Sequence, residues 1–330
     1  MKVGAWIHER NLVLDGQIQA ASAAGLELFR TYSVDYSQRA APALHRVGMG
    51  LVAGLHVDAG ELVRDWRSQV RLDELERTVA LDVPLEAVCV GNELREGGDE
   101  PERKRFTARL SFGLANVLGV YRDWLRGRGL KTPLTYAMEG IVCDAEGRFF
   151  EWLWPLVDAC DVVGMNLYPM GERAWFTQGA FKESRRFLCE PRARHDRLAR
   201  FEIQLRTVLS QLEACGKELL LTETGFPSAV GFDLAPAEEG VPAGRSLVIP
   251  RHDREAYADA MTEFAEILAR ASREYPERMR GIIFYEWRDN LYHGKIWNVE
   301  DSPIHTAFGL CERDGSPKLD IPRLVNILKG

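Results

Sequence analysis

Two glutamates, each directly after an apolar run, are the residues of this chain best suited to chemistry. Glu93 follows the run 87–91, and Glu223 follows the run 219–222. A strand of a parallel barrel ends in this way when it delivers a side chain to the pocket above its carboxyl end. Two carboxyl groups that share a cleft can cleave a glycosidic bond, one as proton donor and one as nucleophile. Glu93 is the candidate acid/base and Glu223 the candidate nucleophile.

The elements that must position these glutamates follow an alternating pattern. Short apolar runs alternate with longer amphipathic stretches, which predicts strands connected by helices. The clearest helices are predicted over about 102–126 and from about residue 252 onward. Eight strands with helices between them fit a single (β/α)8 TIM barrel domain over residues 1–330. The predicted strands cover residues 3–7, 26–32, 50–55, 87–91, 133–137, 162–167, 219–222 and 282–285.

A doubly wound sheet is the competing architecture. It usually carries a glycine-rich phosphate turn after its first strand. Residues 7–11 read Ile-His-Glu-Arg-Asn and contain no glycine, so the barrel is favoured. Two connections, 170–184 and 228–250, are longer than a barrel needs. Both leave the carboxyl ends of predicted strands, and we expect them to be extended loops that help to bind substrate.

The composition argues against several classes of partner and cofactor. The net charge is -7, with acidic and basic residues mixed along most of the chain, which argues against nucleic acid. The arginine-rich stretch 182–200 is either a solvated helix face or a docking site for an acidic partner. No apolar run is long enough to span a membrane. Neither metal-ligand spacing nor a nucleophile elbow nor a phosphate loop is present, so no metal or organic cofactor is expected.

The cysteines predict a reducing compartment. The chain has six, without a CxxC pair, and Cys89 and Cys160 lie inside apolar strand-like runs. Free cysteine in such a run behaves as a small buried hydrophobe, so we expect reduced thiols and a cytoplasmic protein. The first predicted strand begins at residue 3 with no signal peptide before it, which agrees, although a processed secreted form would look the same. The oligomeric state is not readable from the sequence.

Both glutamate motifs resemble the signature strands of glycoside hydrolase family 17. Residues 90–93 (Val-Gly-Asn-Glu) and 222–228 (Thr-Glu-Thr-Gly-Phe-Pro-Ser) carry the likeness. It continues in residues 29–32, 161–169 and 308–318, so the matching segments cover most of the chain in the right order. The resemblance implies the clan A (β/α)8 glycosidase fold. It also implies the activity of that family, which contains retaining β-1,3-glucanases and related transglycosylases.

Two departures from the family pattern bear on specificity. Phe226 stands where the family usually has tryptophan, and the eighth predicted strand is only loosely similar to that of the family. Trp287 instead resembles the strand-eight tryptophan of other clan members, which forms the floor of the subsite for the reacting sugar. The linkage preference is therefore open, with β-1,3 as the first expectation.

Further residues are predicted to line the substrate pocket. Arg30 would keep Glu223 ionised, or else make a surface ion pair. Tyr168 would donate a hydrogen bond to the same carboxylate, or else pack in the core. Asn92 could donate a hydrogen bond to a sugar hydroxyl. The other predicted substrate-binding residues are Tyr32, His56, Asn166, Glu286 and Trp287.

Several of these positions have a second interpretation. Trp287 and Trp175 could stack on the apolar face of a sugar or pack in the core, and His56 could bind a hydroxyl or cap a loop. Glu9, Glu139 and Glu286 lie near predicted strand ends; any of them could bind sugar hydroxyls, and one could replace Glu93 as the acid. Such an acidic pocket suits neutral sugars and disfavours uronic acids and phosphosugars.

The leading hypothesis is therefore a retaining β-glycosidase whose partner is a carbohydrate, a β-linked glucan or its oligosaccharides. A transglycosylase would use the same residues and would make products longer than the starting oligosaccharide. A β-glycosidase of different sugar specificity is the next alternative. The alternative from another class is a sugar-binding barrel without catalysis, which would bind sugars but resist covalent trapping.

Overall fold

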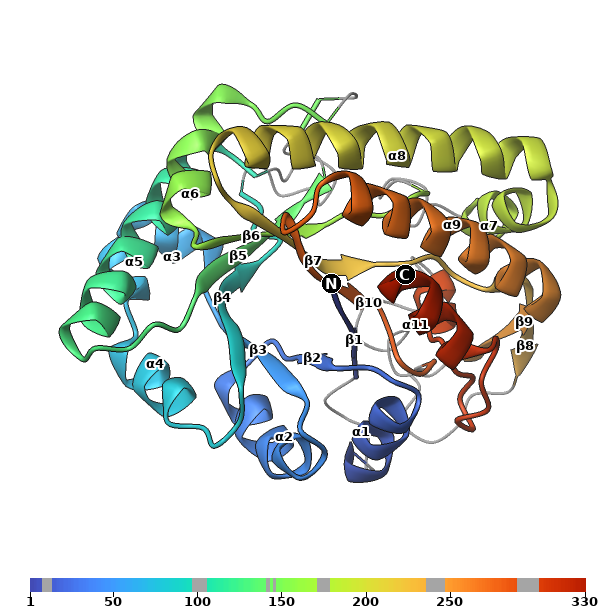
Figure 1. The fold of residues 1–330 in the computed structure, drawn as a ribbon, viewed down its shortest axis with the longest axis horizontal. Helices are drawn as coiled ribbons and strands as arrows, with labels where there is room; N and C mark the ends of the chain where they lie inside the picture. The colour runs from blue at the N-terminus through green and yellow to red at the C-terminus, as the bar shows by residue number, and fades with distance from the viewer. Residues whose placement is uncertain are drawn as a thin grey trace.

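Eight parallel strands close into a barrel in the computed structural model, with neighbours in the order β1-β10-β7-β6-β5-β4-β3-β2. The structure describes residues 1–7, 14–96, 106–140, 143–144, 147–170, 179–235, 247–289 and 303–330. Helices surround the strands on the outside (Figure 1). The predicted (β/α)8 barrel is therefore confirmed. The barrel strands are β1 (Lys2–Trp6), β2 (Leu28–Arg30), β3 (Gly50–Leu55), β4 (Leu85–Asn92), β5 (Leu134–Glu139), β6 (Val162–Asn166), β7 (Glu218–Thr224) and β10 (Met279–Phe284).

The helices begin where side chains cap them. Thr107 accepts a hydrogen bond from the backbone of Leu110 at the start of α5, and Asp253 accepts one from Ala256 at the start of α9. The helix predicted from about residue 102 thus begins at Ala108. The helices are α1 (Leu14–Ala23), α2 (Val34–Val47), α3 (Ala59–Arg64), α4 (Leu72–Val79), α5 (Ala108–Gly127), α6 (Trp154–Ala159), α7 (Ala180–Cys189), α8 (Pro191–Ala214), α9 (Arg254–Glu274) and α11 (Ile321–Lys329), with 3-10 turns η1 (Trp66–Gln69), η4 (Glu151–Leu153) and η6 (Pro303–Ala307).

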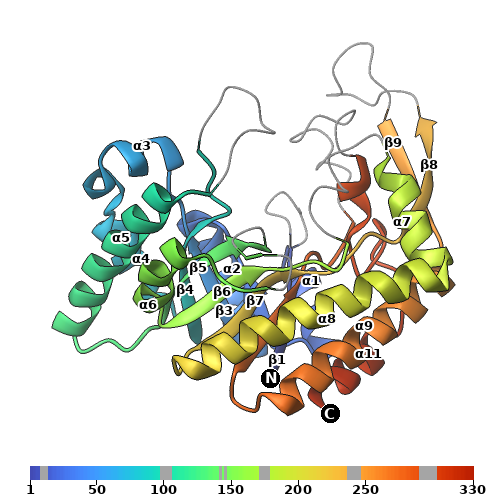
Figure 2. The same cartoon turned by 90° about the horizontal axis from the view of Figure 1, so that it is seen from above.

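The connection after β7 contains a hairpin that the sequence did not predict. Strands β8 (Ala229–Ala235) and β9 (Leu247–His252) pair antiparallel within the segment that was expected to be a loop. Figure 2 shows the hairpin beside α7 at the edge of the molecule, and the rings of Phe232 and Phe181 lie 4.8 Å apart. The glycine, proline and alanine content of the segment concealed the strands, because it lowers the apparent strand propensity.

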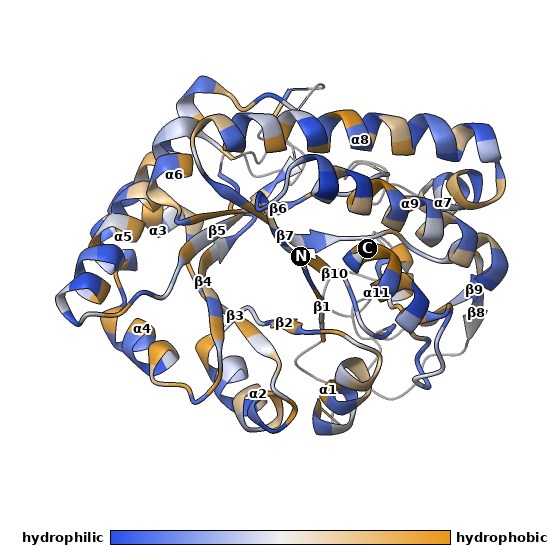
Figure 3. Ribbon diagram, viewed as in Figure 1, coloured by the Kyte–Doolittle hydropathy of each residue, from blue (hydrophilic) through white to orange (hydrophobic). Residues whose placement is uncertain are grey.

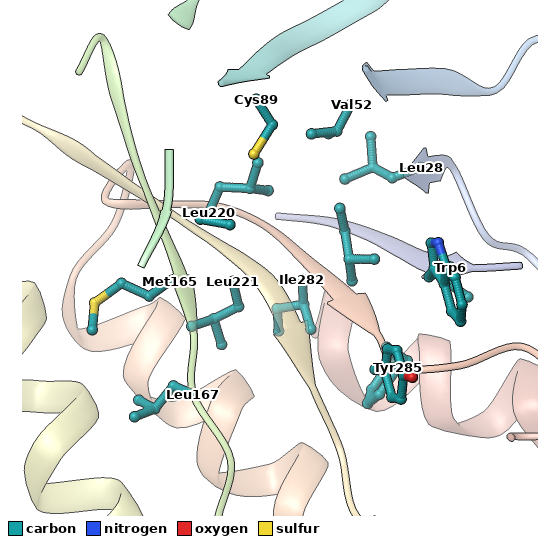
Figure 4. Close-up of a cluster of buried hydrophobic side chains, with 14 of the residues drawn as sticks. Trp6, Leu28, Val52, Cys89, Met165, Leu167, Leu220, Leu221, Ile282 and Tyr285 are labelled. Carbon is teal, nitrogen blue, oxygen red and sulfur yellow. The ribbon is translucent and has the colours of Figure 1, made fainter. Parts of the chain in front are cut away.

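The core fills the barrel and the space beneath the helices. Figure 4 shows Leu28, Val52, Cys89, Leu220 and Ile282, from five different strands, pointing toward one another inside the barrel. All five are at most 2% exposed. Hydrophilic and hydrophobic residues alternate around the outer helices such as α8 (Figure 3), as an amphipathic helix on a buried sheet requires.

The cysteines belong to this packing or to the surface. All six are unpaired, and Cys89 and Cys160 are buried, as predicted for these two positions. Burial raises the pKa of the Cys160 thiol to about 12, so the group stays a neutral thiol. In the part of the chain that the structure describes, no helix is long and apolar enough to cross a membrane.

A buried ion pair anchors the turn that precedes the last helix. The Lys318 side chain is 0% exposed, and its Nζ donates to Asp289 Oδ1 at 2.6 Å and to Ser228 Oγ at 2.8 Å. It also donates to the carbonyl oxygen of Ala307 at 3.2 Å. Asp289 Oδ1 accepts a further hydrogen bond from the backbone of Gly309 at 2.8 Å. These contacts compensate two buried charges. They also connect three parts of the chain, which are the segment after β7, the segment after β10 and the end of η6.

Gly54 allows β3 to approach the chain that follows β2. A Cβ at this position would lie 2.5 Å from the Thr31 carbonyl oxygen and 2.5 Å from the Tyr32 Cα, which is closer than real contacts allow. The Gly54 backbone also donates to Thr31 Oγ1 at 3.2 Å. The absent side chain thus keeps residues 30–32 close to the end of β3.

We expect Gly54→Ala to lower the free energy of unfolding by about 1–3 kcal/mol, because a methyl group would overpack two rigid backbones. Urea denaturation measures the change. Gly119→Ala in α5 is the matched control, since a Cβ there meets nothing within 4 Å. That substitution should raise stability by up to about 1 kcal/mol through helix propensity. Similar effects of the two substitutions would contradict the close approach of β3.

Candidate active site

The carboxyl ends of four strands bring a group of polar side chains together. Parallel strands in a barrel end at the same face, where their last side chains meet. Hydrogen bonds connect residues from β2, β4, β6 and β7 that are up to 193 positions apart in the sequence. We call this group the polar cluster; it consists of Arg30, Asn92, Glu93, Asn166 and Glu223.

Glu223 is held by a cation and two phenols. Arg30 Nη1 donates to Glu223 Oε1 at 2.7 Å, and the Tyr32 hydroxyl donates to the same oxygen. The Tyr168 hydroxyl donates to Oε2 at 2.7 Å. Burial, and then the charge of Glu223, raises the pKa of Tyr168 well above its usual value, so this phenol keeps its proton. The Glu223 carboxyl, only 5% exposed, is therefore compensated in charge and fixed in orientation.

Arg30 links β2 to two other strands. Its side chain is 0% exposed. Besides its bond to Glu223, Nη1 donates to the Thr222 carbonyl oxygen at 2.7 Å, and Nη2 donates to Asn92 Oδ1 at 2.7 Å. A buried guanidinium with several acceptors is fixed in one position. Arg30 thereby sets the places of both Glu223 and Asn92.

Glu93 leaves β4 through an unusual backbone turn. Its φ is +45°, in the left-handed region that non-glycine residues rarely adopt, and it follows Gly91 at φ +83° by two residues. Such a conformation costs on the order of 1–3 kcal/mol and persists where its surroundings support it, commonly at functional sites. The Glu93 backbone N–H donates to the Ala137 carbonyl oxygen on β5 at 3.1 Å.

Asn166 connects the two glutamates of the polar cluster. Its Nδ2 donates to Glu93 Oε1 at 2.8 Å and to Asn92 Oδ1 at 3.1 Å. Its Oδ1 accepts from Thr222 Oγ1 at 2.7 Å, which fixes the orientation of the amide. The environments of the two carboxyl groups thus differ, since Glu93 accepts from a neutral amide and Glu223 pairs with a guanidinium. Different environments allow one carboxyl to stay ionised while another holds a proton.

Glu139, at the end of β5, lies next to the polar cluster. It is 1% exposed, and Arg95 Nε donates to its Oε1. Burial, and then the charge of Glu93, raises the pKa of Glu139 to about 7, while Arg95 acts in the opposite direction. Glu139 was predicted near the pocket, and its interaction with Glu93 places it beside the candidate acid/base.

Three other predicted residues differ in exposure and in contacts. His56 is exposed just beyond the end of β3. Glu286 is fully buried, and its carboxyl interacts electrostatically with Asp289 and Lys318 at the closing turn, with burial raising its pKa well above the usual range. The Trp287 side chain is buried, and its backbone N–H donates to the Trp6 carbonyl oxygen at 2.8 Å. Glu9 and Trp175 lie outside the described residues.

Tyr285 is a site residue that sequence reasoning missed. Its ring stacks on that of Trp6, with centroids 5.1 Å apart and an angle of 8° between the ring planes. Figure 4 shows the two side chains next to each other. Burial raises its pKa well above the usual value, and Glu223 and Glu93 contribute to the shift, so the phenol lies within electrostatic reach of both carboxyl groups. Its position at the end of the last predicted strand was the available signal.

Metal-binding side chains do not cluster in the described residues. There, no group of three or more His, Cys, Asp or Glu side chains is arranged to hold an ion. The chemistry that the described side chains can supply is that of carboxyl groups, phenols and amides around one buried cation. Such a set can bind hydroxyl groups and can transfer protons.

Comparison with known proteins identifies the fold. No family model matches the chain, and no curated protein matches it. An endo-laminarinase from Formosa is 16% identical, with a TM-score of 0.62 over 96% of this chain and 84% of that one. A plant β-glucan endohydrolase is 16% identical, with a TM-score of 0.62 over 96% of this chain and 98% of that one.

A β-glucuronidase from Ruminococcus gnavus is also similar. It is 15% identical, with a TM-score of 0.59 over 99% of this chain and 49% of that one, so this chain spans about half of its length. The three neighbours are glycoside hydrolases with TIM-barrel folds. At these identities, the likeness shows the shared barrel.

We expect Arg30→Met to lower the free energy of unfolding by about 3–5 kcal/mol at pH 7, because it leaves the Glu223 carboxylate buried without its cation. Adding Glu223→Gln should recover most of this loss, since a neutral amide needs no counter-ion. Urea denaturation of both single variants and the double variant measures the coupling.

The exposed pair Arg64 and Glu61 is the matched control for this cycle. Its side chains are 73% and 45% exposed, and its coupling should stay below about 1 kcal/mol. Additive effects of the Arg30 and Glu223 substitutions would contradict the buried ion pair.

Proposed function

We propose that this protein is a retaining β-glycosidase that acts on β-linked glucan or gluco-oligosaccharides, with β-1,3 linkages as the first substrates to test. The proposal rests on one observation above all. Glu223 is fixed by Arg30, Tyr32 and Tyr168, while Asn166 joins the same hydrogen-bonded cluster to a second glutamate, Glu93. We also propose that residues 1–330 act as one catalytic domain.

The two glutamates would act in succession. Glu93 protonates the glycosidic oxygen while Glu223 attacks the anomeric carbon, which breaks the bond to the leaving group and forms a glycosyl-enzyme. Glu93, now a carboxylate, then takes a proton from water, and the water displaces Glu223. The anomeric configuration is inverted twice and therefore retained.

The contacts of each glutamate suit its proposed role. Arg30 neutralises the charge of Glu223, and the two phenols hold its oxygens in fixed directions, as an attacking carboxylate requires. Glu93 has the neutral Asn166 amide on one oxygen. A neutral amide can accompany either protonation state of a carboxyl, which suits a group that must give up a proton and regain it.

Trp6 and Tyr285 form a stacked aromatic pair, 3% and 9% exposed, and Tyr285 lies within electrostatic reach of the glutamates. Sugars present apolar C–H faces, and flat rings bind them by dispersion and burial of apolar area. We propose Tyr285, in place of Trp287, as the floor of the subsite for the reacting sugar, because the Tyr285 phenol interacts electrostatically with both glutamates.

The charges of the site favour a neutral sugar. Glu93, Glu139 and Glu223 lie within one region, and the cations Arg30 and Arg95 are already paired with carboxylates there. A uronic acid would add another negative charge next to these three carboxyl groups, at a cost in affinity. This argument supports a glucan over a glucuronide, although one neighbour is a β-glucuronidase.

Product analysis tests the proposal directly. Gluco-oligosaccharides with β-1,3, β-1,4, β-1,6 and β-1,2 linkages, together with an aryl β-glucuronide, are incubated with the protein and their products weighed by mass spectrometry. We expect shorter products from the β-1,3 series, with β-configured new reducing ends by NMR before mutarotation. Glu223→Ala should abolish them. Longer products would indicate transglycosylation, and unaltered turnover by Glu223→Ala would overturn the assignment.

The acid role of Glu93 predicts a dependence on the leaving group. Glu93→Gln should slow oligosaccharide cleavage by about 10²–10⁴-fold, because the departing hydroxyl then leaves without a proton. An aryl glycoside with an acidic phenol needs no such proton, so its pre-steady-state burst should be nearly unaffected. Stopped-flow release of the phenol measures this step. Glu61→Gln, on exposed α3, is the control, and equal losses on both substrates would argue against an acid at position 93.

A further inference from the structure

Glu139 is a buried carboxyl that the proposed mechanism does not use. It is paired in register with Asn166 on β6, and Asn166 Nδ2 donates to Glu93 Oε1 at 2.8 Å. Arg95 Nε donates to Glu139 Oε1. The other oxygen, Oε2, is buried and has no hydrogen-bond partner among the residues that the structure describes. A buried carboxyl with one unpartnered oxygen, next to a catalytic candidate, calls for a functional explanation.

Three successive contacts with β5 hold the turn that carries Glu93. The backbone N–H of Glu93 donates to the Ala137 carbonyl oxygen at 3.1 Å. The backbone N–H of Leu94 donates to the Tyr136 hydroxyl at 2.8 Å. The Arg95 side chain then reaches Glu139. β5 therefore supports the left-handed conformation of Glu93, and Glu139 is the last of its three contacts.

We propose that Glu139 is a positioning residue for Glu93: through Arg95 it holds the turn, and its negative charge in the resting site strengthens the hold of Glu93 on its proton. The proposal rests on the proposed function, in which Glu93 is the acid/base. Glu139 does not touch the substrate in this scheme. It ensures that a proton is present beside the glycosidic oxygen at neutral pH.

The physical basis is repulsion between two carboxylates in a dry environment. Burial and the charge of Glu93 raise the pKa of Glu139 to about 7, although the Arg95 cation opposes the shift. Two groups that interact in this way titrate as a pair, so the last proton of the pair leaves near neutral pH. An ionised Glu139 must, by the same interaction, raise the affinity of Glu93 for its proton.

Three phenols also face the pair: Tyr32, Tyr168 and Tyr285 interact electrostatically with Glu93, and burial raises the pKa of each well above its usual value, so all three stay neutral. From the segment after β4, Glu93 and Arg95 face Glu139, and from β5 itself the Tyr136 phenol interacts with it. Burial raises the pKa of Tyr136 well above its usual value, so Tyr136 stays neutral. From β6, the residue in register is the neutral Asn166. The pH response around neutrality is therefore assigned to the two glutamates.

Glu139→Gln tests the proposal through the pH profile of kcat/KM. Glutamine keeps the size of the side chain and an oxygen for Arg95 but carries no charge. Without the negative charge, Glu93 loses its proton at lower pH. The basic limb of the profile, where kcat/KM falls as the pH rises, should therefore move down by about one pH unit, which is a tenfold change in proton affinity. Glu139→Asp, which keeps the charge, should leave the limb closer to that of the unaltered protein.

Glu86→Gln is the matched control, because Glu86 lies at the amino end of the barrel, in β4. It should leave the basic limb in place. A basic limb in Glu139→Gln that coincides with that of the unaltered protein, whatever happens to kcat, would reduce Glu139 to a structural role and overturn the proposal. The proposed function has its own test: if Glu93→Gln slowed oligosaccharides and aryl glycosides equally, Glu93 would not be the acid, and the proposed function would be overturned.

A titration independent of activity keeps the inference falsifiable if Glu139→Gln does not fold. The side-chain carboxyl carbons of ¹³C-labelled glutamate are followed by NMR in the unaltered protein and in Glu93→Gln. We expect the Glu139 signal to titrate at lower pH in the variant, because its negative neighbour is gone. An unchanged midpoint would show that the charge of Glu93 does not act on Glu139, and it would overturn the proposal.

Discussion

The ion pair between Arg30 and Glu223 is the constraint on which the candidate site depends. Both side chains are nearly excluded from water, 0% and 6% exposed, and two such charges are tolerated only if geometry and hydrogen bonds compensate them. Glu223, Thr222 and Asn92 accept from the two terminal nitrogens of Arg30. Closure of the barrel brings the end of β2 within hydrogen-bond distance of the ends of β4 and β7, although none of these strands are neighbours in the sheet. The barrel therefore positions the ion pair, and the ion pair in turn links three strands.

The two glutamates of the polar cluster have different surroundings. Glu223, next to the last residue of β7, meets a guanidinium and two phenols. Glu93 follows β4 in a left-handed turn and meets an amide, with a second buried carboxyl, Glu139, nearby.

A second buried ion pair plays a comparable part on another side of the barrel face. Lys318 and Asp289 join the chain segments after β7 and β10 to the closing turn, and Ser228 accepts from the same ammonium. His252 is the last residue of β9. Its Nε2 lies 3.3 Å from Asp289 Oδ2, and its Nδ1 lies 2.8 Å from Ser228 Oγ. This network attaches the hairpin β8–β9 to the chain that follows β10. One set of charges therefore holds both the connection after β7 and the segment that carries Tyr285.

The sequence by itself determined the order of the eight strands and the approximate place where each one ends, because apolar periodicity is local. Glu93 and Glu223 were singled out in this way, and Arg30 lay in a segment, 29–32, that resembles a known family. The hairpin β8–β9, the bridging role of Asn166, the proximity of Glu139 to Glu93 and the placement of Tyr285 by the site were decided by the tertiary structure. Each depends on register between strands and on barrel closure, which relate residues distant in the chain and leave no local signal.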